Sequence, residues 1–368
     1  MIKFRFKLRP VPVFPILIVI SISLFALLML YSIGAGSFYP WCIKQLGRLL
    51  LGVAALMIVA SVNCTVWRKY AYHCYACCLL LLGIVAIAGK ISMGAQRWLN
   101  LYFFNFQPSE LMRMFLVVAL AKYFSSRGVN EINSVTALIM PLILTAVPIG
   151  LVLLQPDLGT AVLLFCICVS VLFACGVQIW KFVTALAALA ISAPILWGFL
   201  HEYQKKRILM FLSPELDPNG AGYHIIQSKI ALGSGGFFGN GLLNGSQCQL
   251  NFLPEKQTDF VFAALGEELG FLGCILLMAM YATLLVYNHI VAIKARTRFN
   301  QIIVFGINAM LFFYIFINMS MVCGLLPVVG VPLPFFSYGG SSLVVLMACQ
   351  GLVFAADYEQ KHSFGLPG

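Results

Sequence analysis

The chain is long, apolar and basic. It has 368 residues, of which 61% are hydrophobic and 10% are charged. Average soluble domains carry about 25% charged residues, so this composition excludes an ordinary soluble protein and predicts an integral membrane protein. The formal net charge of +11 does not indicate nucleic-acid binding, because basic residues of membrane proteins gather in cytoplasmic loops beside anionic lipid. We expect partners in the membrane and no nucleic acid.

Apolar runs that can cross a hydrocarbon core of ~30 Å recur along the whole chain. They occupy residues 11–33, 46–62, 70–89, 109–124, 135–154, 160–176, 179–200, 260–289, 302–326 and 336–356. The sequence therefore predicts an all-α polytopic membrane protein of about ten transmembrane helices, organised as a single domain over residues 1–368. The polar stretch 201–257, between the seventh and eighth spans, is predicted to be a large extracytoplasmic loop.

The distribution of basic residues predicts the orientation. The N-terminus carries Lys3, Arg5, Lys7 and Arg9 before its apolar run and resembles a signal peptide. Because no small-residue cleavage site follows, we interpret it as an uncleaved first span. With this end inside, the inner segments hold most of the Lys and Arg, so both termini are predicted to be cytoplasmic. All of the unusual polar clusters then fall on the outer face.

The cysteines do not indicate a disulfide scaffold. Most of the 12 lie within apolar spans, where a thiol packs as a small core side chain. Cys74, Cys77 and Cys78 have a spacing seen in metal sites, but no second pair of ligands lies nearby. We therefore expect no metal at these cysteines.

Charged residues precede the fourth and sixth spans. Arg97, beside Trp98, is either an anchor at the lipid headgroups or a phosphate contact. Glu110 and Arg113 are three positions apart and share a helix face. They form either an internal ion pair that braces the bundle or a cationic site for an anionic substrate. Asp157 is expected to cap the sixth helix.

Three carboxylates, Asp259, Glu267 and Glu268, stand at the start of the eighth span. Ionisable groups in a membrane helix are costly and usually functional. Asp259 is the strongest candidate for a catalytic residue. The alternative is that Asp259 and Thr258 only cap the start of the helix. Because adjacent helical positions point about 100° apart, at most one of the two glutamates is expected to face the cavity of Asp259. The pair is predicted to be buried and to support helix packing.

The run GSGGFFGNG at residues 233–241 superficially matches a nucleotide-binding loop. No βαβ unit surrounds it and no Lys-Ser/Thr pair follows, so we expect no nucleotide. These glycines are expected to let the loop approach a ligand or neighbouring helices closely. His201 and His224 lie in the same extracytoplasmic stretch without paired ligands, and we assign them no role.

Five motifs occur in order along the predicted outer face. They are GAQRWLN from Gly94, QPSELMR from Gln107, QPDLGTA from Gln155, LPEKQTDFVFAALGEELGFLG from Leu253 and GVPLPFFSYGGSS from Gly330. Together they resemble the SEDS family (shape, elongation, division and sporulation; RodA, FtsW and SpoVE), which comprises ten-helix polymerases of bacterial peptidoglycan. The stretches 245–260 and 324–340 look more like the rod-shape branch, RodA, than the division branch, FtsW.

This resemblance implies a glycosyltransferase of the bacterial cytoplasmic membrane that polymerises lipid II, the undecaprenyl-pyrophosphate-linked disaccharide-peptide, for cell elongation and shape. The family's essential aspartate maps onto Asp259, as a general base or as a ligand of a divalent cation, Mg or Mn. The resemblance gives candidate contacts to substrate and its pyrophosphate at Arg97, Glu110, Arg113, Asp157, Ser337 and Ser341, and supporting roles to Glu255, Glu267 and Glu268. No nucleotide is required, because the lipid carries its own activated bond.

Two positions depart from the family's pattern. Arg113 stands where Lys is usual, which keeps the positive charge but removes a titratable amine and so favours phosphate binding over proton transfer. Gln257 precedes Thr258 where the family often has His. A direct acid or base role at that position is therefore not expected.

The resemblance also implies partners, and other functions compete with polymerisation. Family members act with a class B penicillin-binding transpeptidase and with other elongation or division proteins. The outer loops lack the SxxK, SxN and KTG motifs of a transpeptidase, so another protein must supply crosslinking. One alternative function is a lipid II flippase or transporter. Another is a scaffold that recruits a penicillin-binding protein.

Overall fold

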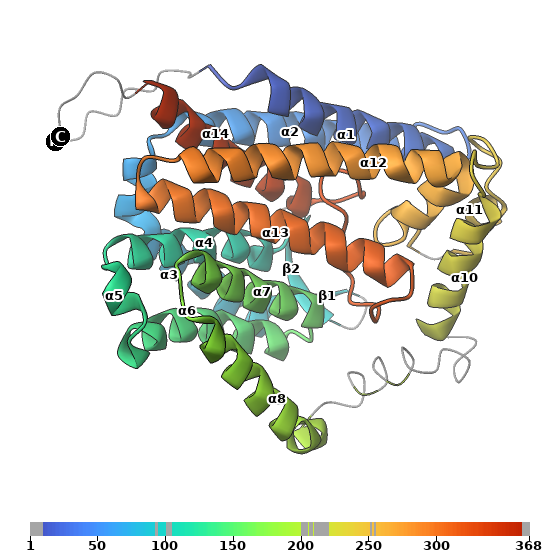
Figure 1. The fold of residues 1–368 in the computed structure, drawn as a ribbon. Helices are drawn as coiled ribbons and strands as arrows, with labels where there is room; N and C mark the ends of the chain where they lie inside the picture. The colour runs from blue at the N-terminus through green and yellow to red at the C-terminus, as the bar shows by residue number, and fades with distance from the viewer. Residues whose placement is uncertain are drawn as a thin grey trace.

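Long helices make up most of the chain (Figure 1). The computed structural model describes residues 10–92, 95–100, 105–199, 205, 209, 221–250, 252–253 and 255–362. The long helices are α1 Val13–Ile33, α2 Trp41–Ser61, α3 Cys64–Ala88, α4 Pro108–Ser125, α6 Val135–Leu154, α7 Leu158–Ala174, α8 Ile179–Phe199, α12 Val261–Lys294, α13 Arg298–Val322 and α14 Ser341–His362. Each overlaps one of the predicted spans. Shorter helices are α5 Val129–Ile132, α10 Ala221–Ser234 and α11 Ser246–Gln249.

Seven of the described helices are long and apolar enough to cross a membrane: α1, α2, α3, α6, α12, α13 and α14. Two others, α7 and the first part of α8, are apolar but shorter. The remaining long helix, α4, carries Glu110, Arg113 and Lys122. A multi-pass helical membrane protein is therefore confirmed.

The all-α class is confirmed by the long helices, and the described residues depart from it only between α3 and α4. There β1 Lys90–Ser92, β2 Ala95–Asn100 and β3 Asn105–Phe106 form an antiparallel sheet in the order β1-β2-β3. This connection contains Lys90, Arg97 and several amide side chains and is too polar for another span. Its backbone groups are satisfied by pairing between strands instead of within a helix.

The start of the last span was also predicted too early. The apolar run suggested a helix from residue 336, but α14 begins at Ser341. Pro332 and Pro334 cannot donate to a helical ladder, and Gly339 and Gly340 favour an irregular chain. Residues 328–340 therefore form a loop, mostly buried between Val331 and Ser337, which becomes part of the candidate site.

The bundle has two distinct ends in Figure 1. The start of α1, the end of α14 and the short α5 lie at one end, and α10 and α11 lie at the other. We refer to these as the α5 end and the α10 end. The central helices are α4 and α14, whose residues are buried along almost their whole length. Charged groups on the inner faces of these two helices are consequently removed from both lipid and water.

A break at Gly270 divides α12, where the backbone leaves the helical region with φ 63° and ψ −160°. The carbonyls of Glu267 and Glu268 therefore lose the helical donors four residues ahead. The amides of Asn240 and Gly241 replace them, at 3.0 and 2.9 Å. The glycine-rich loop thus supplies the hydrogen-bond donors that the broken helix lacks. Buried backbone carbonyls require such partners.

The same loop also accepts the amides that the break leaves free. Phe271 donates to the carbonyl of Gly236 at 3.0 Å, and Leu272 donates to that of Phe237 at 3.2 Å. A side chain at Gly239 would overlap the carbonyl of Glu268. The close approach expected of the glycine-rich run is confirmed, and its target is a neighbouring helix.

We predict that Gly239→Ala destabilises the protein, because the residue has φ 83° and no space for a Cβ. Left-handed strain and overlap together should cost at least about 2 kcal/mol of unfolding free energy. Thermal unfolding of the purified protein measures this. The matched control is Gly47→Ala in α2, where a Cβ meets nothing within 4 Å. That change should stabilise the helix slightly, and equal losses from both variants would contradict the prediction.

Candidate functional site

A buried ion pair on α4 lies at the centre of the site. Arg113 binds the Oε2 of Glu110 at 2.8 Å, and both side chains are at most 5% exposed. The second terminal nitrogen of Arg113 donates to the hydroxyl of Thr160 on α7 at 2.7 Å. Tyr314 of α13 donates to the same Oε2 of Glu110 at 3.0 Å. One guanidinium and one carboxylate therefore connect three helices.

Asp157 extends this network at the start of α7. Its Oδ1 accepts the backbone amide of Thr160 at 3.1 Å, which confirms the predicted helix cap. Its Oδ2 accepts the hydroxyl of Thr160 at 2.9 Å and the side-chain amide of Gln107 at 3.2 Å. We call Gln107, Glu110, Arg113, Asp157, Thr160 and Tyr314 the buried charge cluster.

The cluster contains two carboxylates and one guanidinium with little access to water. Charges buried in this way require partners, and removing one partner is strongly destabilising. Within the described chain, the Nε of Arg113 and the hydroxyl of Ser109 have no hydrogen-bond partner. The cluster therefore braces the bundle and still has donor capacity.

Asp259 lies in the turn that precedes α12 and is partly exposed. The N-cap residue of α12 is Phe260, so the alternative of Asp259 as N-cap is not realised. A Cβ placed on Gly330 would lie 3.5 Å from the Oδ2 of Asp259. The carboxylate thus faces the loop that precedes α14.

Asn318 of α13 fixes the backbone around Asp259. Its side-chain amide donates to the carbonyl of Asp259 at 2.9 Å and to that of Val331 at 2.7 Å. Asn318 follows Tyr314 by four positions, so the two share a helix face about 6 Å apart along the axis. One face of α13 therefore brings Asp259 close to the buried charge cluster.

Ser337 and Ser341, predicted to contact substrate, both bind protein backbone. The hydroxyl of Ser337 donates to the carbonyl of Thr258 at 2.6 Å and accepts the amide of Leu333 at 2.7 Å. The hydroxyl of Ser341 accepts the amide of Gln107 at 3.3 Å. These hydroxyls position the segments that carry Asp259 and Glu110, and substrate contact through them stays a prediction.

Glu255, Glu267 and Glu268 are all partly or fully buried within the protein. Glu255 accepts the hydroxyl of Thr258 at 3.1 Å and so closes the turn before Asp259. Glu267 accepts the backbone amides of Gln247 at 2.8 Å and Cys248 at 3.3 Å, at the start of α11. Glu268 is fully buried next to it. This geometry fits supporting roles for all three.

His224 of α10 lies beside the turn that carries Asp259. Its ring centroid is 6.3 Å from that of Phe260. Burial lowers the pKa of His224 from its usual value, and the negative charge of Glu255 partly opposes this shift. Burial therefore favours the neutral form of this imidazole.

Arg97 lies in β2 between α3 and α4, but its side chain is outside the described part of the structure. The placement of its guanidinium stays a prediction. Two residues that sequence reasoning missed are Tyr314 and Asn318. Polar groups four positions apart in an otherwise apolar helix were the available signal, because such a pair marks one polar face.

The described residues do not by themselves form a metal centre. No group of three or more His, Cys, Asp or Glu side chains is placed to hold an ion in the described ranges. Asp259 would supply a single carboxylate. Mg²⁺ is often held by one or two carboxylates together with substrate phosphates, so the chain fits a divalent ion only if the substrate completes its coordination.

The fold and the site define a class: a multi-pass helical membrane protein with a partly exposed carboxylate close to a buried charge cluster. A sequence model described as "Cell cycle protein" for FtsW, RodA and SpoVE matches residues 7–362. The chain belongs to this FtsW/RodA/SpoVE family.

Individual relatives agree with the family. Over 348 residues the chain is 42% identical to peptidoglycan glycosyltransferase MrdB of Escherichia coli K12, covering 94% of this chain and 93% of that protein. It is 37% identical over 306 residues to a probable peptidoglycan glycosyltransferase FtsW of Geobacter sp. M18, covering 83% of each. The higher identity to MrdB than to this FtsW favours the elongation branch.

Solved structures show the same fold. One is a chain from a study of the structural coordination of polymerization and crosslinking by a peptidoglycan synthase complex. It superposes with a TM-score of 0.85 at 30% identity, covering 96% of this chain and 99% of the other. The crystal structure of the rod shape determining protein RodA of Thermus thermophilus gives a TM-score of 0.72 at 28% identity, covering 95% and 97%.

Proposed function

We propose that this protein is a peptidoglycan glycosyltransferase that polymerises lipid II into glycan strands for cell elongation and shape. The observation that carries the proposal is the position of Asp259 close to the buried charge cluster, in a chain 42% identical to MrdB. A partly exposed carboxylate suits a base that must reach substrate. The buried charge cluster can act as the rigid scaffold that holds this base in place.

In the proposed reaction, a hydroxyl of the acceptor sugar attacks the anomeric carbon of the donor. The new C–O bond forms as the bond from that carbon to the lipid pyrophosphate breaks, with inversion. Asp259 accepts the hydroxyl proton. Arg97 and Arg113 are the candidates to stabilise the pyrophosphate that leaves.

We propose that the α10 end faces the outside of the bacterial cytoplasmic membrane. The ten long helices then cross the bilayer, both termini are cytoplasmic, and residues 201–257 form the large extracytoplasmic loop of a single domain, 1–368. In support, the start of α1 and the end of α14 share the opposite end of the bundle (Figure 1). The basic segment from Lys294 to Arg298 connects two helices at that end.

A divalent cation, Mg or Mn, is proposed as a substrate-dependent component. In that case Asp259 would be the protein's ligand to the ion instead of the base, and the pyrophosphate would supply further oxygen ligands. When bound, the ion would neutralise charge on the leaving group. Nucleotide is not part of the proposal.

The proposed partners are lipid II, a class B penicillin-binding transpeptidase and other elongation or division proteins. The likeness to a chain from a peptidoglycan synthase complex supports a crosslinking partner. Polymerised strands must be crosslinked to build a wall, and the chain's outer loops lack transpeptidase motifs. A partner with that activity is therefore required.

The test is polymerisation of purified lipid II by the purified full-length protein, with and without a chelator and with and without the transpeptidase. Glycan strands longer than a disaccharide are the expected product. If proteoliposomes move lipid II across the bilayer and no polymer forms under any condition, the protein is a transporter and the proposal fails. Activity that falls with chelation and returns with Mg or Mn would support the cation.

We predict that Asn318→Leu lowers the rate of polymerisation per folded protein, in addition to any loss of stability. The change leaves the carbonyls of Asp259 and Val331 without their donor, which should cost about 1–3 kcal/mol for each buried group and release the turn that carries the base. Specific activity per folded protein is the measurement. The matched control is Asn288→Leu. This change breaks a buried pair of amide side chains between Asn288 of α12 and Gln350 of α14. Equal activity losses in both variants would contradict a positioning role for Asn318.

A further inference from the structure

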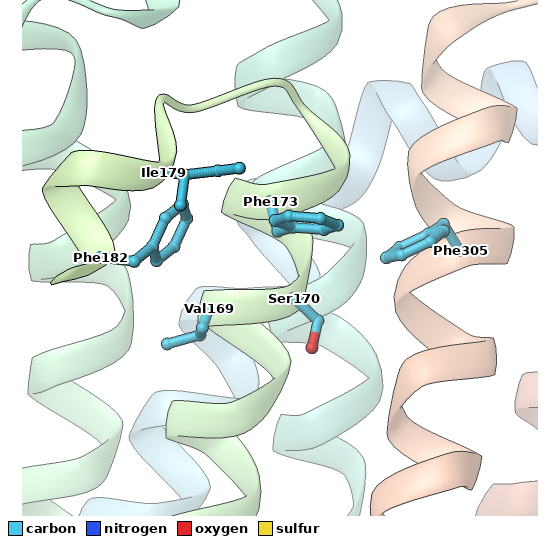
Figure 2. A pocket seen from close by; sticks show the side chains of 6 residues that line it. All are labelled: Val169, Ser170, Phe173, Ile179, Phe182 and Phe305. Carbon is cyan, nitrogen blue, oxygen red and sulfur yellow. The ribbon is translucent and has the colours of Figure 1, made fainter. Parts of the chain in front are cut away.

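An open apolar crevice lies between α7, α8 and α13, away from the candidate site (Figure 2). Its volume is about 350 Å³, within the ~300–1,000 Å³ typical of ligand pockets. It is lined by Val169, Ser170 and Phe173 of α7, Ile179 and Phe182 of α8, and Phe305 of α13. Figure 2 shows Phe173 between the α8 pair on one side and Phe305 on the other.

The lining offers contact to hydrocarbon and little else. Its one polar side chain, Ser170, donates its hydroxyl to the carbonyl of Cys166 at 2.8 Å. The hydroxyl is thereby satisfied within α7. Phe173 and Ile179 are 59% and 68% exposed, so the crevice is open along the side of the bundle. In a membrane this surface faces lipid, and an extended acyl chain matches both its shape and its polarity.

The crevice ends in a region of positive charge at the α5 end. The three segments beside the crevice, 127–134, 174–181 and 294–298, contain five cations and one acid: Arg127, Lys181, Lys294, Arg296, Arg298 and Glu131. The end of α14 brings Asp357 and Glu359 to the same end of the bundle, where Asp357 binds Lys361 and Glu359 accepts the side-chain amide of Asn300. Arg298 precedes Phe305 by seven positions, or two helical turns. Arg298 therefore lies on the same face of α13 as Phe305, about 10 Å closer to the N-terminal end of that helix.

The nearest cations are held in place without being neutralised. Arg298 donates to the carbonyl of Arg127 at 2.8 Å, and Lys181 donates to the carbonyl of Asn133. Within the described residues, neither side chain is paired with a carboxylate. Both therefore keep N–H donors for another acceptor. Trp180, 58% exposed between Ile179 and Lys181, is of the type that lies at headgroup depth.

We propose that this crevice binds an acyl chain of an anionic phospholipid, whose headgroup phosphate is contacted by Arg298 and Lys181. The guanidinium binds phosphate oxygens in a forked geometry, and the ammonium adds a second charge. Basic surfaces between helices at a membrane face select anionic headgroups for this reason. The site is separate from Asp259 and the buried charge cluster and does not depend on the proposed polymerase activity.

The test compares phosphatidylglycerol with phosphatidylcholine of identical acyl chains, bound to the purified full-length protein and measured by native mass spectrometry. The wild type should retain phosphatidylglycerol at least about fivefold better, as roughly one favourable charge contact would give. Arg298→Gln with Lys181→Gln should reduce that preference towards unity. Ser170→Phe, which fills the crevice and leaves the cations intact, should reduce retention of both lipids.

Matched controls separate the site from general lipid binding. Ile143→Phe adds a ring to an exposed position on α6, and Lys44→Gln removes an exposed cation on α2. Neither should change the lipid preference. If Ser170→Phe lowers the yield of folded protein, Val169→Phe replaces it. Equal retention of the two lipids by the wild type, or unchanged retention by both crevice-filling variants, would overturn the proposal. Loss of bound lipid on adding glycerol phosphate alone would do the same, because it would show that the acyl chain is not required.

Discussion

Asp259→Asn is expected to reduce lipid II polymerisation by about 10²–10⁴-fold, the usual contribution of a positioned acid or base. The amide keeps the shape of the side chain but cannot accept the proton of the attacking hydroxyl. The fold should survive, because Asn318 and the nearby loop hold this turn through backbone groups. Polymer length and rate with purified lipid II are the measurements. Thermal unfolding in the same detergent checks the fold.

Asp357→Asn provides the matched control for this change. Asp357 is a buried carboxylate near the C-terminal end of α14, where it binds Tyr287 at 2.9 Å and Lys361 at 2.7 Å. It lies at the α5 end, away from the candidate site. The same chemical change there should affect stability without reducing polymerisation per folded protein. Near wild-type polymerisation by Asp259→Asn would remove Asp259 from the proposed mechanism.

Arg113→Met is expected to lower the unfolding free energy by about 3–5 kcal/mol, the cost of leaving a buried charge without its partner. Glu110 would lose its cation, and Thr160 would lose the donor that connects α7 to α4. Arg113→Lys keeps the charge but cannot bind both partners in a fork, so its loss should be smaller. Chemical or thermal unfolding of the purified protein measures both.

The double variant Glu110→Gln/Arg113→Met separates bracing from substrate binding. It removes both charges together, so it should be more stable than Arg113→Met alone. If Arg113 only braces the bundle, the double variant should regain polymerisation along with stability. If Arg113 also contacts pyrophosphate, the double variant should fold and remain inactive. A double variant no more stable than Arg113→Met would contradict the ion-pair account itself.

Much of the site could be predicted from sequence because its members lie in short motifs. Asp157 was expected to cap a helix, since a polar side chain at a helix start meets free amides wherever the helix packs. Glu110 and Arg113 were expected to share a helix face, since they are three positions apart, and an ion pair between them was one of the two alternatives. Both contacts are local, and helical geometry alone specifies them.

Contacts across long sequence separations could not be predicted in the same way. Thr160 bridges Arg113 to Asp157 because α7 packs against α4. The partners of Ser337 and Ser341 lie on segments far away in the chain. No periodicity reveals which distant backbone group will meet a given hydroxyl. The backbone partners of these two hydroxyls are visible only in the structure, and their contact with substrate stays a prediction.

The amino-acid sequence alone is enough to identify a multi-pass helical membrane protein of the FtsW/RodA/SpoVE family. Apolar runs long enough to cross a bilayer leave the backbone few choices besides the helix, and motif residues are read directly from the chain. How those residues meet can be seen only in the folded protein. There the glycine-rich loop binds the break in α12, and Asn318 donates to the backbone carbonyl of Asp259. An apolar crevice also lies next to Arg298 and Lys181. Buried backbone groups must find partners wherever packing places them, and packing is a property of the whole chain.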